Sequence, residues 1–142
     1  MREISGDILE HLGERPVVIT TNGKVWPDGT AVMGDGCARE AARRLPDLPA
    51  RLGRLLMEKG NRVFDLGDGI VSFPVEESPW EVSSITLIRR SALELRELAD
   101  RRGWHEVVLP PPGCGGAGLT VAEVRPVLES ILDDRFLLLR QD

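Results

Sequence analysis

The stretch that decides the fold is residues 109–119, with the sequence LPPPGCGGAGL. Residues 106–109 precede it and predict a strand, and residues 120–132 follow it with the spacing of a helix. A strand, a glycine loop and a helix N-terminus in that order are typical of an anion site. Glycines let the backbone approach a phosphate, and free N–H groups at the helix start point toward it. We therefore expect a phosphorylated ligand at this loop.

The bulk composition predicts one globular domain over residues 1–142 and excludes several kinds of protein. A net charge of −5 argues against general nucleic-acid binding, which usually relies on a basic face. Cys37 and Cys114 are too few for a disulfide framework and lack metal-type spacing, so we expect free thiols, no metal and no cofactor. Without a signal peptide or an apolar run of about 20 residues, the chain is expected in the cytoplasm, without membrane partners.

Strand and helix patterns alternate along the chain, which predicts an α/β layered domain with a largely parallel sheet. The turn Gly67-Asp68-Gly69 predicts a hairpin that makes the sheet mixed. Strands are expected at residues 2–5, 17–21, 61–66, 70–73, 106–109 and 135–139, and helices at residues 8–12, 37–45, 49–59, 80–102 and 120–132.

Three loops leave the carboxyl ends of predicted strands, at residues 22–36, 74–79 and 110–118. Ligands in such sheets bind outside the carboxyl ends, so neighbouring strands would bring these loops to one cleft. Residues 34–38 form a second glycine loop that opens a helix, and two such loops favour a two-sided clamp on a diphosphate. Asp35 in this loop also suits a helix macrodipole, and Asp7 is both a helix N-cap candidate and an acceptor for an exocyclic amine.

Other anion-binding motifs fit the glycine loop less well. Residues 113–118 match G-x-G-x-x-G, but Asp133 and Asp134 precede the last strand, and too little chain remains to complete a dinucleotide fold. Position 120 is Thr where cysteine phosphatases have Arg, and Gly-Lys-Ser/Thr does not occur. A merely structural turn remains an alternative.

Taken together, these segments resemble the macrodomains, a family of ADP-ribose-binding modules. The family's Gly-Asp-Ile/Leu is similar to residues 6–8, its Asn after the second core strand to Asn22, and its glycine loops to residues 34–38 and 113–119. The resemblance is closest to the branch of the terminal ADP-ribose glycohydrolase and the bacterial antitoxins that remove ADP-ribose from DNA. That branch has Phe-Pro and Val-Arg-Pro segments similar to residues 73–74 and 124–126.

The resemblance implies a three-layer α/β/α macrodomain-like sandwich with a mixed central sheet. It implies ADP-ribose, or a mono-ADP-ribosylated macromolecule, as the partner, and we expect a monomer. By the resemblance, Asp7 and the Ile8 amide hold adenine, Asn22 orients the distal ribose, and the glycine loops hold the diphosphate and that ribose. The implied ligand-binding residues are Asp7, Ile8, Asn22, Gly34, Gly36, Cys37, Gly113, Cys114, Gly115, Gly116, Ala117 and Gly118.

The sequence departs from the branch at two positions that matter for chemistry. The branch commonly has Lys where this chain has Glu76, and the glycohydrolase has Asp where this chain has Ala117. We therefore expect a hydrolase without a catalytic lysine, in which water attacks C1″ of the distal ribose. The candidate catalytic residues are Asn22, which positions the ribose, and Asp35 or Glu76 as general base. The alternatives are a non-catalytic ADP-ribose reader and a phosphatase acting on ADP-ribose 1″-phosphate. Protein and nucleic acid both remain open as the modified target.

Overall fold

The structure is a computed structural model that describes residues 1–115 and 118–140. Its strands are β1 (Arg2–Ser5), β2 (Val17–Thr21), β3 (Phe64–Gly67), β4 (Ile70–Pro74), β5 (Val107–Leu109) and β6 (Phe136–Arg140). Its helices are the 3-10 helix η1 (Ile8–His11) and the α-helices α1 (Cys37–Arg44), α2 (Leu48–Lys59), α3 (Ile85–Arg102) and α4 (Val121–Glu129).

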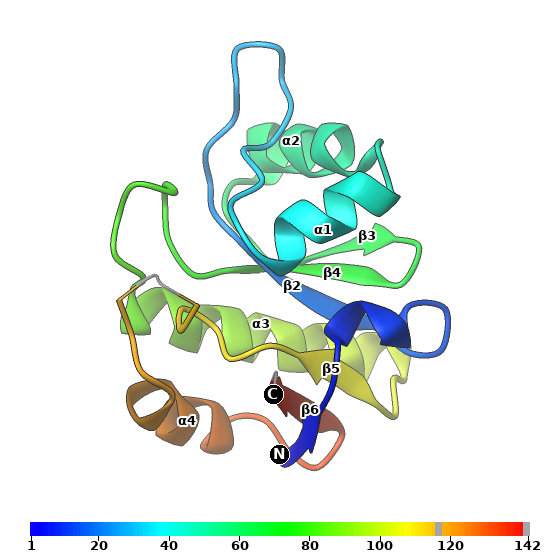
Figure 1. Ribbon diagram of the computed structural model, residues 1–142, viewed down its shortest axis with the longest axis vertical. Helices are drawn as coiled ribbons and strands as arrows, with labels where there is room; N and C mark the ends of the chain where they lie inside the picture. The colour runs from blue at the N-terminus through cyan, green and yellow to red at the C-terminus, as the bar shows by residue number, and fades with distance from the viewer. Residues whose placement is uncertain (116–117, 141–142) are drawn as a thin grey trace.

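The six strands form one mixed sheet in the order β1-β6-β5-β2-β4-β3 (Figure 1). Neighbouring strands run parallel except β3, which is antiparallel to β4. The hairpin at Asp68 and the mixed sheet predicted from the sequence are therefore both confirmed. Asp68 has a φ of 54°, and the glycines on either side also have positive φ, as a tight turn requires.

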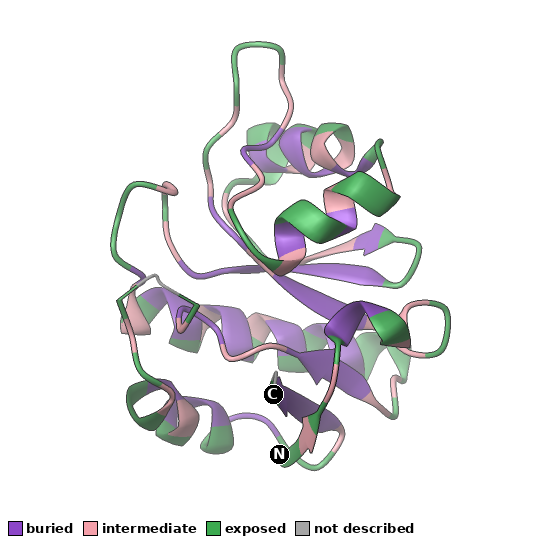
Figure 2. Cartoon of the chain, in the orientation of Figure 1, coloured by how far each residue is buried: buried purple, intermediate pink, exposed green. Residues whose placement is uncertain are grey.

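Both faces of the sheet are buried because side chains alternate along each strand. Val17 and Ile19 pack on one face with α1, α2 and η1, whereas Val18 packs on the other face with α3 and α4. The same alternation separates Val108 from its neighbours in β5. Figure 1 shows α1 and α2 on one side of the twisted sheet and α3 and α4 on the other, and Figure 2 shows the buried strands between helices with exposed outer faces. The predicted three-layer α/β/α architecture is confirmed.

The three predicted loops meet at the carboxyl edge of the sheet. β5, β2 and β4 are consecutive neighbours and parallel, so residues 110–120, 22–36 and 75–84 leave the same edge. The Gly23 N–H donates to the Glu77 carbonyl at 3.0 Å, which ties the loop after β2 to the loop after β4. The loops after β4 and β5 also lie side by side, on the left of Figure 1.

Most element boundaries agree with the sequence prediction to within one to three residues, but the prediction that a helix starts at Trp80 is wrong. α3 begins after Ser84, whose hydroxyl accepts the Leu87 N–H at 3.2 Å as an N-cap. The Ser84 N–H donates to the Val75 carbonyl at 2.9 Å, so residues before it are held in the loop. This cap agrees with the preference of serine for helix starts.

Candidate functional site

Asn22 closes the base of the loop between β2 and α1. It is 3% exposed, its Nδ2 donates to the Val32 carbonyl at 3.0 Å, and its Oδ1 accepts the Lys24 N–H at 2.9 Å. The side chain therefore holds both arms of the loop together where the chain leaves β2. This structural role was not predicted from the sequence, and the predicted ribose contact would have to be made alongside it.

α2 supports the same loop through Gly53, which lies in the middle of that helix. A Cβ at Gly53 would lie 2.0 Å from the Gly29 carbonyl oxygen and 2.9 Å from the Ala31 nitrogen. The Ala31 N–H also donates to the Pro49 carbonyl at 2.9 Å. Glycine is needed here because the loop backbone packs directly on the helix backbone. An isolated glycine within a helical pattern was a sequence indication of this contact.

The first glycine loop leads into the N-terminus of α1. Gly36 is the N-cap and has no side chain to accept from the first turn, which leaves donors at this helix start for an anion. Asp35 is 97% exposed and pairs with Arg39 at 3.5 Å, so its charge is solvated and partly balanced. Burial raises the pKa of the Cys37 thiol, and hydrogen bonds with Thr20 oppose that rise. Cys37 is thus a neutral, packed side chain whose backbone amide faces the helix start.

The second glycine loop packs closely against the loop after β4. Gly113 has a φ of 75°, and a Cβ there would lie 2.9 Å from the Ser83 Cβ. Gly118 has a φ of 98°, and a Cβ there would lie 2.9 Å from the Val82 Cγ1. A Cβ at Gly115 would meet no atom of the described residues within 4 Å. Two glycines of this loop therefore serve packing and turn geometry, whereas Gly115 lies on the open side.

This loop contains three more predicted ligand-binding positions: Cys114, Gly116 and Ala117. The Cys114 thiol packs on the α3/α4 core and donates to the Pro112 carbonyl at 3.4 Å. Burial raises the pKa of that thiol, with Glu123 adding to the rise. Gly116 and Ala117, both predicted ligand-binding residues, lie outside the described residues.

The N-terminus of α4 is closed by a capping box, which modifies the anion site expected there. The Thr120 hydroxyl accepts the Glu123 N–H at 3.2 Å, and the Glu123 carboxylate accepts the Thr120 N–H at 3.2 Å. A carboxylate already occupies the positive end of this helix dipole, so a second anion is disfavoured directly above it. Within the described chain, the loop amides and the α1 N-terminus are therefore better placed for a phosphate.

Asp7 and Ile8 follow the carboxyl end of β1, at the same edge of the sheet. Asp7 is the N-cap of η1, and its carboxylate accepts the Leu9 N–H at 3.1 Å. Asp7 is exposed, Ile8 is 3% exposed, and η1 packs on α1, β2 and β5. The expected cap is confirmed, and the exposed carboxylate is also available to an amine.

Glu76 lies in the loop after β4, among other acidic side chains. Burial raises the pKa of its carboxyl, and the nearby negative charge of Glu81 raises it further. Because a raised pKa keeps a carboxyl closer to neutral, Glu76 suits proton transfer better than the solvated Asp35 does.

Lys24 and Trp80 form an exposed pair at this edge that was not predicted from the sequence. The Lys24 ammonium lies 5.9 Å from the centre of the Trp80 ring, so the loops after β2 and β4 contact one another here. Trp80 is 69% exposed, and Trp26, from the same loop as Lys24, is 47% exposed. Lys24 thus lies beside the loop that contains Glu76.

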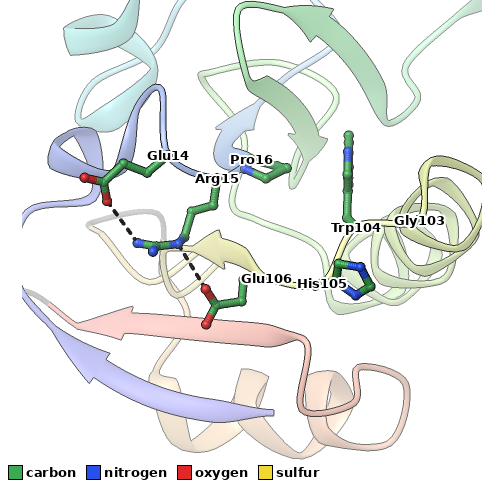
Figure 3. A pocket seen from close by; sticks show the side chains of 7 residues that line it. All are labelled: Glu14, Arg15, Pro16, Gly103, Trp104, His105 and Glu106. Atoms are coloured by element: carbon green, nitrogen blue, oxygen red, sulfur yellow. Dashed lines mark hydrogen bonds and ion pairs between the residues drawn. The ribbon is translucent and has the colours of Figure 1, made fainter.

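A cavity of about 280 Å³ lies at the opposite, amino edge of the sheet and contains none of the predicted site residues. It lies between the start of β2 and the start of β5. Arg15 pairs there with Glu14 at 3.5 Å and with Glu106 at 3.4 Å, so its charge is balanced (Figure 3). The cavity is lined by Glu14, Arg15, Pro16, Gly103, Trp104, His105 and Glu106.

Two further structural findings concern the described residues only. In residues 1–115 and 118–140, no group of three or more His, Cys, Asp or Glu side chains has an arrangement that could hold a metal ion. Among the helices described over the same ranges, none combines the length and apolar character needed to cross a membrane.

Comparison with solved structures identifies the fold. The macrodomain of Mycobacterium tuberculosis DarG matches with a TM-score of 0.80 and 26% identity, covering 97% of this chain and 95% of that one. The macrodomain of Thermus aquaticus DarG matches with a TM-score of 0.81 and 22% identity, over 99% and 97%. Thermosipho africanus DarTG, solved in complex with ADP-ribose, matches with a TM-score of 0.80 and 18% identity, over 99% of this chain and 42% of that one. No protein-family model matches the sequence, and no curated protein has a matching sequence.

The chain therefore has the macrodomain fold. The resemblance to macrodomains that was predicted from the sequence is confirmed, and macrodomains of DarG are among the structural relatives of this chain.

Proposed function

We propose that this chain binds ADP-ribose at the carboxyl edge of its sheet. The observation that carries the proposal is that two glycine loops leave the same edge of the sheet, after the neighbouring parallel strands β2 and β5, in a macrodomain fold. A structural relative, the Thermosipho protein, was solved with ADP-ribose. The net charge of −5 does not oppose this, because backbone amides supply positive potential locally.

The ligand is proposed to lie across the sheet edge from β1 to β4. Asp7 accepts from the adenine amino group, and the Ile8 amide lies beside it. The uncapped start of α1 and the second glycine loop hold the diphosphate, and Asn22 and these loops hold the distal ribose. The proposed ligand-binding set is the one predicted from the sequence: Asp7, Ile8, Asn22, Gly34, Gly36, Cys37, Gly113, Cys114, Gly115, Gly116, Ala117 and Gly118.

We further propose that the chain hydrolyses mono-ADP-ribose from a macromolecule without a catalytic lysine. Water attacks C1″, the bond from C1″ to the linking atom breaks, and the departing group takes a proton. Glu76 is the better supported general base because it is partly buried beside Glu81, whereas Asp35 is fully solvated and paired. A carboxylate near the distal ribose also stabilises the positive charge that develops on it.

The experiment measures release of ADP-ribose from two substrates, a protein modified on acidic residues and a modified oligonucleotide. We compare the wild type with Glu76→Gln and Lys24→Ala. The expected result is release that falls by roughly 100-fold or more in Glu76→Gln and stays near wild type in Lys24→Ala. Loss of release in Lys24→Ala would refute the lysine-free mechanism, because Lys24 lies beside the Glu76 loop.

A reader of ADP-ribose without turnover is the second candidate function. It is favoured by Glu76 at the position where the similar branch has lysine. The same experiment separates the two functions: tight binding of ADP-ribose with no release from either substrate identifies a reader. Calorimetry with free ADP-ribose tests the shared premise, and affinity weaker than millimolar would refute both.

We also propose that the chain acts as a monomer in the cytoplasm, without general nucleic-acid binding. The two free thiols, Cys37 and Cys114, support a reducing compartment. Sedimentation at micromolar concentration tests the monomer, and fluorescence titration with an unmodified oligonucleotide tests the absence of nucleic-acid binding.

A further inference from the structure

Ser83 is a buried hydroxyl without a partner in the described chain. The residue is 5% exposed, and its Oγ has no hydrogen-bond partner among residues 1–115 and 118–140. Folded proteins seldom leave a buried hydroxyl unpaired, because it has lost its hydrogen bonds to water without replacement. The position therefore calls for an explanation beyond packing.

Ser83 directly precedes a residue that is held by hydrogen bonds. Ser84, the next residue, caps α3 and donates its N–H to the Val75 carbonyl at 2.9 Å. Val82, the preceding residue, is 70% exposed but lies near Gly118, at the end of the second glycine loop. The bonds of Ser84 thus hold the backbone on the C-terminal side of Ser83 in place.

The neighbour of Ser83 is the second glycine loop. A Cβ at Gly113 would lie 2.9 Å from the Ser83 Cβ, and a Cβ at Gly118 would lie 2.9 Å from the Val82 Cγ1. The segment 82–84 therefore lies against both ends of that loop. The same segment is joined through Ser84 to Val75, the residue before Glu76. Ser83 therefore lies beside the proposed diphosphate loop, in a segment joined to the strand end that leads to the proposed general base.

We propose that Ser83 is a positioning residue for the second glycine loop. Its hydroxyl donates a hydrogen bond to a backbone carbonyl of the turn at residues 113–115 in the complex with a diphosphate. Binding then satisfies a donor that the described residues leave unpaired, so part of the affinity comes from this bond. The inference rests on the proposed function, because it concerns the loop that holds the ligand.

This role predicts opposite effects on folding and on binding. Removing an unpaired hydroxyl from the ligand-free protein does not destabilise it, so Ser83→Ala is expected to keep or raise Tm. The same change removes a hydrogen bond from the bound state, so Kd for ADP-ribose is expected to rise about tenfold. A merely structural serine would lower Tm and leave Kd unchanged.

Ser91, in the helix α3 that follows Ser83, provides a matched control. It is fully buried, but its Oγ donates to the Pro74 carbonyl at 2.6 Å. Ser91→Ala is expected to lower Tm by several degrees and to change Kd by less than about twofold. Ser83→Ala is thus expected to lose affinity and keep Tm, whereas Ser91→Ala is expected to lose Tm and keep affinity.

The experiment measures thermal unfolding and calorimetric binding of ADP-ribose for the wild type and both variants. Hydrogen exchange of residues 113–115 adds a direct readout, since ligand-induced protection there should weaken in Ser83→Ala. The proposal is overturned if Ser83→Ala binds like wild type or loses Tm as Ser91→Ala does. A wild type that does not bind ADP-ribose refutes the proposed function and this inference together, whereas normal binding by Ser83→Ala refutes this inference alone.

Discussion

Replacing Gly115 by valine tests whether the second glycine loop approaches a phosphate. An added Cβ at Gly115 meets no atom within 4 Å in the part of the chain that the structure describes, so the free energy of unfolding should change by no more than about 0.5 kcal/mol. In the proposed complex, the valine occupies the space through which the phosphate reaches the loop amides. Losing one hydrogen bond to a charged group costs about 1.5–3 kcal/mol, which weakens binding roughly 10- to 150-fold.

Gly113→Ala is the matched comparison in the same loop. The φ of 75° at Gly113 costs an L-residue about 1–2 kcal/mol. Crowding against the Ser83 Cβ at 2.9 Å and the Ile88 Cδ1 at 3.1 Å adds about 1–3 kcal/mol. The sum of roughly 2–5 kcal/mol should lower Tm by roughly 5–15 °C.

Differential scanning calorimetry gives Tm for both variants, and titration calorimetry gives their affinity for ADP-ribose. The expected pattern is a folded Gly115→Val that binds weakly and a destabilised Gly113→Ala. Wild-type affinity in Gly115→Val, or a loss of Tm there equal to that of Gly113→Ala, would refute the assignment of Gly115 to the ligand side.

Three further variants test other parts of the site. Asp7→Asn keeps the helix cap, so its Tm should fall less than that of Asp7→Ala. Because the amide adds a donor that faces the adenine amino group, calorimetry should show weaker binding of ADP-ribose and unchanged binding of ribose 5-phosphate. Burial and Glu81 raise the pKa of Glu76, so the folded protein binds this proton more tightly than the unfolded chain and loses stability as pH rises. Glu76→Gln should therefore raise Tm at pH 7, and the gain in Tm should vanish at pH values below 4.5, the ordinary pKa of a glutamate. A gain in Tm at every pH would contradict this reasoning. Gly53→Ala would place a Cβ 2.0 Å from the Gly29 oxygen, so it should lower Tm and ligand affinity together, unlike the roughly 1 kcal/mol gain usual for this change in a helix.

Local patterns were enough to predict most of the fold. The β-branched run of β2 predicted a strand buried on both faces, and Val17 and Val18 do pack on opposite layers. The turn at Asp68 predicted the one antiparallel pair of the sheet. These predictions succeeded because strand alternation and turn conformation depend on residues close together in the chain.

The start of α3 shows where local patterns fail. The spacing of apolar residues extended the predicted helix back to Trp80, but Ser84 ends it, through its cap on Leu87 and its bond to the Val75 carbonyl. That second bond joins two parts of one loop whose path depends on β2 and β4. The boundary therefore follows from folded contacts and not from periodicity.

The candidate ligand class and the candidate site residues were predicted from patterns along the chain, because glycine loops, caps and carboxylates act through their own backbone neighbourhood. The contacts between loops were not. Three such contacts join segments that are far apart in sequence: Lys24 with Trp80, Gly53 with Gly29, and Ser83 with Gly113. Such contacts exist because parallel strands bring their carboxyl ends to one edge, and the order of strands in the sheet is set by packing of the whole core. The glycine loop at residues 109–119 thus predicts an anion site, while its neighbours across the sheet edge determine which of its glycines remain open to a ligand.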